Sequence, residues 1–88
     1  MPEAPVPDPE AALEIDARGL LCPLPVLRAR KALLGLPEGA LLRVLATDAM
    51  ARIDLPHFCA ESGHAHLALT EDAGVQIHLI RRGKLAGE

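Results

Sequence analysis

Hydrophobic and polar residues follow regular periods along most of the chain, and these periods predict its strands. Apolar and acidic residues alternate from Leu13 to Ala17, which predicts a half-buried strand. Residues 40–46 are apolar on both sides except at Arg43, as expected of a central strand. Residues 64–70 and 75–80 both alternate around a short turn-forming loop, so they are predicted to pair as an antiparallel hairpin.

Two helices are predicted between these strands. Apolar side chains recur at helical spacing from residue 23 to residue 34, and Gly35 ends the segment. The second helix is predicted to begin at about Pro56, because proline fits the first turn of a helix, and to end at Gly63. The order is strand, helix, strand, helix, strand, strand. We therefore expect an α+β fold, a two-layer α/β sandwich with two helices on one face of a four-stranded mixed sheet.

The length of 88 residues fits a single domain. Prolines interleaved with acidic residues predict a flexible tail over residues 1–11, since such a stretch buries too little apolar surface to offset its ordering entropy. The domain is expected over residues 12–84, followed by a short C-terminal tail at residues 85–88.

Composition argues against several classes of function. The formal net charge of −3 gives no general attraction to nucleic acid or to an anionic membrane, and Phe58 is the single aromatic residue, so bases have no stacking platform. The apolar runs are far shorter than the roughly 20 residues that span a bilayer. The start of the chain does not resemble a secretion signal, and the two cysteines are best interpreted as free thiols, so a cytoplasmic protein is expected.

The most informative segment is the Cys-Pro-Leu-Pro sequence at residues 22–25, which places a thiol at the start of the first helix. Pro23 is expected at the first helical position, with Pro25 at the third. This arrangement would leave the N–H groups of Leu24 and Val26 free near the Cys22 sulfur, at the positive end of the helix dipole. Such placement predicts a lowered thiol pKa and a nucleophilic thiolate.

Two further residues could act on this thiol or on the loops around it. Arg18 would lower the pKa of Cys22 further if its guanidinium pointed at the sulfur. Asp48 follows the second predicted strand and could orient a loop or, as we prefer, cap the next helical turn. An exposed apolar patch around Leu20, Leu21 and Leu24 would suit transient docking of a partner.

Five short motifs occur in a specific order and spacing, and together they give the chain a family resemblance. They are Cys22-Pro23-Leu24-Pro25 after a strand, Arg30-Lys31-Ala32, Pro37-Glu38-Gly39, Asp54-Leu55-Pro56-x-Phe58-Cys59, and Gly63-His64. From about residue 13 to residue 83 the chain resembles the TusA family, also called SirA-like. One departure is Ala49, where members often have proline after the aspartate.

The resemblance implies a sulfur carrier, a sulfurtransferase in the sense of a persulfide relay protein. Cys22 would accept a persulfide sulfur from a cysteine desulfurase or a rhodanese and pass it to an acceptor protein. The sulfur would serve tRNA 2-thiouridine formation or another sulfur-transfer pathway. We expect a monomer that needs no cofactor or metal and has no direct contact with nucleic acid or membrane.

Three other functions are compatible with parts of the sequence. The same fold could serve as a non-catalytic regulatory or binding module. Cys22 and Cys59 could form a redox pair if their sulfurs came within bonding range. His57, Cys59, His64 and His66 could suggest zinc, but His57 and Cys59 diverge on a helix while His64 and His66 would share a strand face. Cys59 is expected in the core, and His78 is a potential neighbour of the paired histidines.

Overall fold

The computed structural model describes residues 11–84. The predicted tails at 1–11 and 85–88 lie outside the described residues, apart from Ala11. The elements are β1 (Leu13–Ala17), α1 (Leu24–Leu34), β2 (Leu41–Ala46), α2 (Ala51–Ser62), β3 (Ala65–Asp72) and β4 (Val75–Arg81). Their order confirms the predicted α+β fold.

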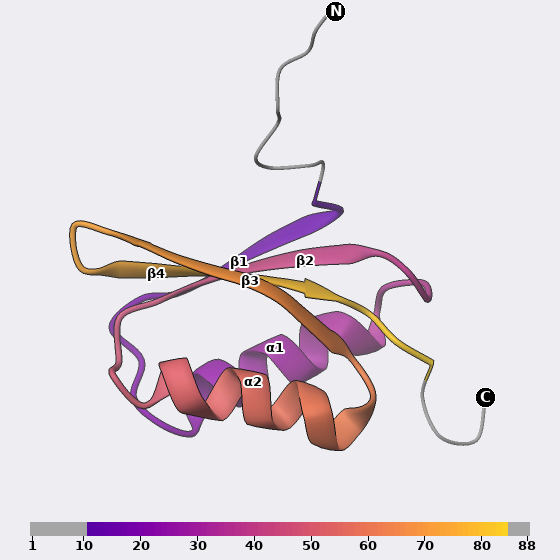
Figure 1. The fold of residues 1–88 in the computed structure, drawn as a ribbon, viewed down its shortest axis with the longest axis horizontal. Helices are drawn as coiled ribbons and strands as arrows, with labels where there is room; N and C mark the ends of the chain where they lie inside the picture. The colour runs from indigo at the N-terminus through magenta and orange to yellow at the C-terminus, as the bar shows by residue number, and fades with distance from the viewer. Residues whose placement is uncertain (1–10, 85–88) are drawn as a thin grey trace, which may run out of the picture.

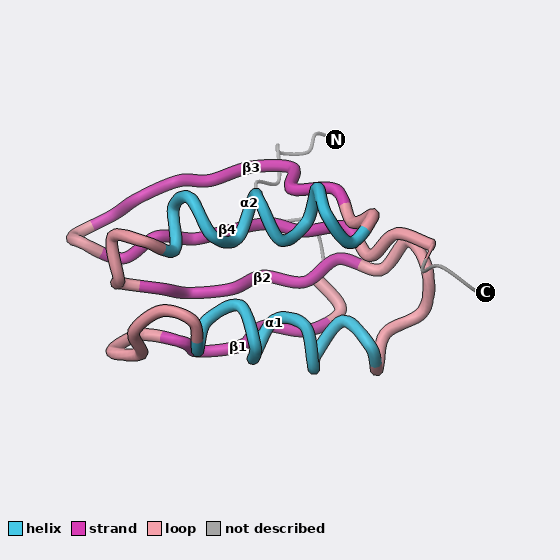
Figure 2. Tube along the Cα trace, turned by 90° about the horizontal axis from the view of Figure 1, so that it is seen from below, coloured by secondary structure: helices cyan, strands magenta, loops and turns pink. Residues whose placement is uncertain are grey.

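The molecule has two layers, a twisted sheet and a pair of helices on one of its faces (Figure 1). The strand order is β1-β2-β4-β3; β1 and β2 are parallel, while β4 runs antiparallel to both β2 and β3. Figure 2 shows α1 along β1 and β2, and α2 along β4 and β3. Within the described residues, neither helix has the length and apolar content needed to cross a membrane.

The core lies between the two layers. Each helix buries residues four positions apart, which form a stripe facing the sheet. Strand β2 supplies alternate residues to the same core, and each fully buried leucine contributes about 1.5–3 kcal/mol relative to exposure. The buried residues of these elements are Pro25, Ala29 and Leu33 of α1, Ala51, Leu55 and Cys59 of α2, and Leu42, Val44 and Ala46 of β2.

The prediction that the second helix begins at about Pro56 was wrong. Helix α2 already begins at Ala51 and continues through Pro56 to Ser62. A proline inside a helix costs roughly 3 kcal/mol in a solvent-exposed setting. Here Ala51, Leu55 and Cys59 are buried against the sheet on both sides of the proline, so packing keeps the helix in one piece. Gly63 ends it as predicted, with a left-handed φ of 85°.

The hairpin is longer than its sequence pattern indicated. Glu71 and Asp72, predicted as loop, pair with Gln76 and Val75. The turn consists of Ala73 and Gly74, whose φ angles of 54° and 84° match the two left-handed residues of a tight two-residue hairpin. At the other end β3 begins one residue later than predicted, so His64 precedes the strand.

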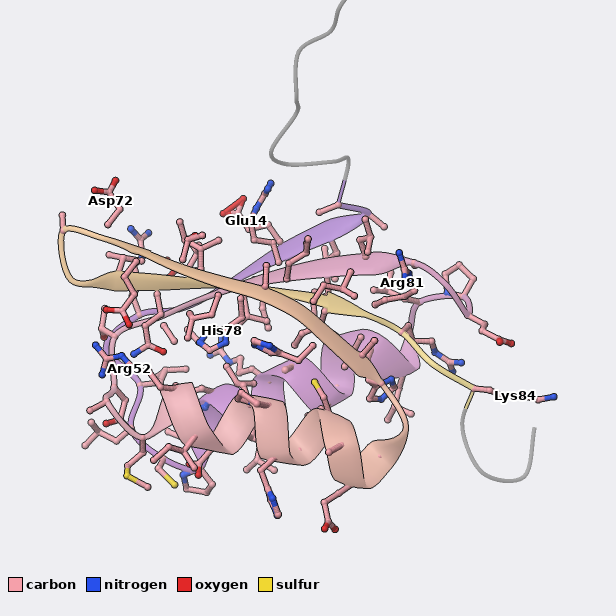
Figure 3. All side chains as sticks on the ribbon, viewed as in Figure 1. Glu14, Arg52, Asp72, His78, Arg81 and Lys84 are labelled. Carbon is pink, nitrogen blue, oxygen red and sulfur yellow. The ribbon has the colours of Figure 1, made fainter. Side chains whose placement is uncertain are left out.

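The two faces of the sheet differ in environment. Figure 3 shows Glu14, Asp72 and Arg81 on the face away from the helices, whereas His78 lies between the sheet and the helix layer. Accordingly, His78 is fully buried. A histidine in this position has to find its hydrogen-bond partners inside the protein.

We predict that Leu55→Ala lowers the free energy of unfolding by about 2–5 kcal/mol, because it removes a fully buried side chain beside Pro56. Ile53→Ala on the exposed side of the same helix should change it by about 0.5 kcal/mol or less. Urea unfolding followed by circular dichroism measures both. Equal losses in the two variants would show that packing against the sheet does not hold α2 together.

Candidate functional site

Cys22 lies exposed in the turn between β1 and α1. Its peptide bond to Pro23 is cis. The helix begins at Leu24, one residue later than predicted, and Pro23 occupies the capping position. The Leu24 N–H donates to the Leu21 carbonyl at 2.8 Å, so the prediction that this group is free to face the sulfur was wrong.

Asp48, in the loop after β2, holds the Cys22 loop in place. Its Oδ2 accepts a 2.8 Å hydrogen bond from the Cys22 backbone N–H, while its Oδ1 lies 3.4 Å from the Met50 N–H. The Asp48 carbonyl also accepts the Ala51 N–H at 2.9 Å, in the first turn of α2. Asp48 therefore has one of the two roles considered from the sequence, because it orients the Cys22 loop. The preferred capping role was wrong, since Met50 occupies the capping position of α2 and no side chain there forms a cap hydrogen bond.

A second contact ties the same two loops together. The Gly19 N–H donates to Thr47 Oγ1 at 2.9 Å. Because β1 and β2 are parallel neighbours, their carboxyl ends meet at one edge of the sheet, and the loops that follow them meet there as well. The topology thus brings Cys22 to the amino-terminal end of α2.

The thiol faces carboxylates, and its pKa is raised. A hydrogen bond with the Asp54 side chain has the largest effect on the pKa of Cys22, followed by desolvation and by the negative charges of Asp54 and Asp48. The prediction of a lowered pKa was therefore wrong. A helix dipole acts as about half a charge, whereas each carboxylate carries a full charge, so the carboxylates dominate.

Arg18 does not supply the positive charge that the sequence suggested. Its Nε and Nη2 donate to Asp16 at 2.8 and 2.9 Å, and its backbone N–H also donates to that carboxylate at 3.0 Å. These bonds lower the pKa of Asp16 to about 2. The guanidinium is thus engaged by Asp16, and Arg18 is not among the groups that shift the pKa of Cys22.

Exposed apolar side chains flank the thiol from both loops. Leu21 and Leu24 lie on either side of Cys22 in the chain, and Met50 and Ile53 lie beside Asp48 and Asp54 at the start of α2. All four side chains are between 46% and 67% exposed. We call these four residues the apolar rim. Leu20, which was predicted as part of this patch, instead packs against the core.

His64 and His66 have structural partners rather than a metal ion. Among residues 11–84, no group of three or more His, Cys, Asp or Glu side chains is arranged to hold a metal ion. His64 and His66 do not share a strand face as predicted: His64 Nδ1 accepts the Gly83 N–H at 2.9 Å, whereas the His66 ring contacts His78.

Cys59 is only 1% exposed, which confirms its expected place in the core, and burial raises its pKa to about 11. Cys22, in contrast, is exposed, and both cysteines are free thiols.

The sequence and the fold both match one family of known proteins. The family described as Sulfurtransferase TusA matches residues 13–82, which is most of the chain. The chain belongs to the TusA family. It is 45% identical over 74 residues to the sulfur carrier protein TusA of Pseudomonas putida, covering 84% of this chain and 90% of that one. It is 42% identical over 69 residues to the protein of the same name from Pseudomonas syringae, covering 78% and 82%.

A solved structure has the same fold. The SirA-like protein from Desulfitobacterium hafniense superposes with a TM-score of 0.72 at 37% identity, and the match covers 82% of this chain and 99% of that one. Family membership supports a role as a sulfur carrier. The resemblance to the TusA family, which rested on five short motifs, is thereby confirmed.

Two residues beside the thiol were missed or underestimated from the sequence. Asp54 was noted only as part of a family motif, because the helix that contains it was predicted to start at about Pro56, two residues after Asp54 and five residues after the observed start at Ala51. Asp48 was considered only as a cap or loop residue. A useful signal is that Asp48 and Asp54 flank the start of a helix after a strand parallel to the one that precedes Cys22.

We predict that Asp54→Asn lowers the pKa of Cys22, because it removes the largest influence that raises it. At pH 7.5 more thiolate would be present and alkylation by iodoacetamide would be faster. The rate at the Cys22 peptide, followed by mass spectrometry across pH, measures this. Glu61→Gln, the same charge change at the far end of α2, is the control, and an equal response of both variants would contradict the local role of Asp54.

Proposed function

We propose that Cys22 carries sulfur as a persulfide, which it accepts from a cysteine desulfurase or a rhodanese and passes to an acceptor protein. The observation that carries this proposal is the exposed thiol of Cys22, whose backbone N–H is bonded to Asp48 in the loop before α2, in a chain of the TusA family. An exposed thiol can meet the persulfide of another protein directly. Cys59, which lies in the core, cannot do so without unfolding.

The proposed step needs no external oxidant or reductant. The Cys22 thiolate attacks the outer sulfur of the donor's cysteine persulfide and forms a new S–S bond. The donor's own S–S bond breaks, and its electron pair leaves with the donor cysteine as a thiolate. The outer sulfur moves from one cysteine to the other, and delivery to the acceptor repeats the exchange in the same sense.

Asp54 is the proposed acceptor of the thiol proton. The raised pKa of Cys22 means that the resting thiol is protonated near neutral pH, so the proton has to leave as attack begins. The Asp54 side chain is the group with the largest effect on the pKa of this thiol. It can take this proton and return it to the departing donor thiolate, so the exchange leaves the number of protons unchanged.

The apolar rim is the proposed docking surface for both partners. Leu21, Leu24, Met50 and Ile53 expose apolar surface around the sulfur, and binding energy at interfaces concentrates in apolar contacts shielded from water. Docking there would remove water from the thiol while transfer takes place. The rim comes from the ends of both loops and the first turns of the helices that follow them, so a partner that covers it also contacts the loop held by Asp48.

We place this relay in the cytoplasm, where thiols remain reduced, and expect the protein to act as a monomer. The transferred sulfur would go to tRNA 2-thiouridine formation or another sulfur-transfer pathway through the acceptor protein. Contact with the nucleic acid would be made by that acceptor, since this chain has a net charge of −3.

We expect incubation with a cysteine desulfurase and cysteine to add one sulfur, about 32 Da, to the intact protein, and reductant to remove it. The adduct should form on the Cys59→Ser variant and be absent from Cys22→Ser. Intact mass spectrometry of the three proteins makes this comparison. The proposal fails if neither a desulfurase nor a rhodanese loads the wild type, or if Cys22→Ser is loaded as well.

We predict that Leu24→Glu slows sulfur loading on the order of tenfold, because it puts a charge into the apolar docking surface. The half-saturating concentration of the donor should rise. Leu34→Glu is the matched control, since Leu34 is also exposed but lies at the other end of α1. Single-turnover loading rates measure both. Normal loading in Leu24→Glu, with the fold intact by circular dichroism, would rule out docking at the rim.

A further inference from the structure

Three side chains inside the protein form a chain of hydrogen bonds that ends at the Cys22 loop. His66 Nε2 lies 2.9 Å from His78 Nδ1, and His78 Nε2 lies 2.8 Å from Gln76 Oε1. The Gln76 amide then donates to the backbone carbonyl of Asp48 at 2.8 Å. We call His66, His78 and Gln76 the buried polar chain. Through Asp48, whose side chain accepts the Cys22 N–H, it reaches the proposed sulfur site.

The direction of every hydrogen bond in the chain is determined. The Asp48 carbonyl can only accept, so Gln76 must present its NH₂ to it and its Oε1 to His78. His78 must then carry its proton on Nε2, which leaves Nδ1 as an acceptor in the neutral ring. His66 therefore donates from Nε2. Both rings have one tautomer, and the Gln76 amide has one orientation.

The environment keeps both rings neutral. The pKa of His78 is lowered to about 4, mainly by burial and secondly by the His66 ring. Of the charged groups that act on His78, Glu71 of β3 raises its pKa and Arg52 of α2 lowers it, and these two are paired with each other. Burial also lowers the pKa of His66. At neutral pH the chain thus keeps the direction given above.

The burial of these polar side chains carries a desolvation cost that apolar side chains would not have. Gln76 and His78 are fully buried. Like Ile80, they occupy positions on β4 that face the helices. Apolar side chains would satisfy the same positions without the desolvation penalty of two polar groups. What the polar side chains add is a donor aimed at one atom, the Asp48 carbonyl.

We propose that Gln76 is a positioning residue for sulfur transfer. It fixes the Asp48 backbone, and thereby the carboxylate that holds Cys22, while His78 and His66 fix the orientation of the Gln76 amide. This inference rests on the proposed function, because it concerns the geometry in which Cys22 meets a donor. Gln76 touches neither the thiol nor a substrate and acts only through Asp48.

Gln76→Met tests the proposal, because methionine keeps a side chain of similar length but cannot donate to Asp48. The Asp48 carboxylate should then move relative to Cys22, so the alkylation pH profile of Cys22 should shift to lower pH. Sulfur loading at saturating donor should fall about tenfold. Ile80→Val, which removes one methyl group from the same face of the same strand but no hydrogen bond of the chain, is the control and should leave both readouts unchanged.

A second variant covers the case in which Gln76→Met does not fold. His66→Leu removes the far end of the chain at a half-buried position and leaves His78 Nδ1 without its hydrogen-bond donor. It should change both readouts in the same direction, by a smaller amount. The proposal is overturned if the folded variants match Ile80→Val in pH profile and loading rate. A shifted pH profile in a protein whose wild type cannot be loaded would instead retain the positioning role and reject the sulfur-carrier function.

Discussion

The hydrogen bond from the Cys22 N–H to the Asp48 carboxylate is the contact on which the site depends. It joins residues 26 positions apart in sequence at 2.8 Å. It forms because β1 and β2 are parallel neighbours, so their following loops leave the sheet at the same edge. The same carboxylate lies 3.4 Å from the N–H of Met50, the residue before α2, and Asp54 in that helix has the largest effect on the pKa of the thiol. One aspartate therefore links the sheet topology, the start of a helix and the reactive sulfur.

The electrostatics of this junction oppose the effect that the local sequence suggests. A thiol at the amino-terminal end of a helix is usually stabilised as a thiolate. Here Asp54 and Asp48 raise its pKa instead. In the proposed relay this arrangement keeps the idle carrier protonated and weakly reactive, and provides a proton acceptor beside the sulfur when a donor docks. The apolar rim would make that step depend on a partner.

Local periodicity was sufficient to predict most of the fold. The strand at Leu13–Ala17 has the predicted bounds. The element order is as expected, and both helices cover the same face of the sheet, as predicted. The start of α2 was missed because the preference of proline for a first turn is a local rule, whereas Ala51 and Leu55 are held by packing against distant strands.

The candidate site was only partly predictable for a related reason. Cys22 stands out in sequence because its motif is contiguous, but the groups that shift its pKa, Asp48 and Asp54, come from a distant part of the chain. The pairing of His66 with His78 depends on the register of β3 against β4, which shifts between His66 and Ala68. A pattern of alternation cannot reveal that irregularity. Contacts between distant segments therefore required the structure.

In the proposed relay, sulfur is carried on Cys22 itself. The most direct test is tandem mass spectrometry of peptides from the wild-type protein after loading by a cysteine desulfurase, with free thiols blocked under non-reducing conditions. We predict an extra sulfur on the peptide that contains Cys22 and an unmodified, blocked Cys59. An extra sulfur located on Cys59, or its absence from Cys22 in a protein whose intact mass has increased, would contradict the account.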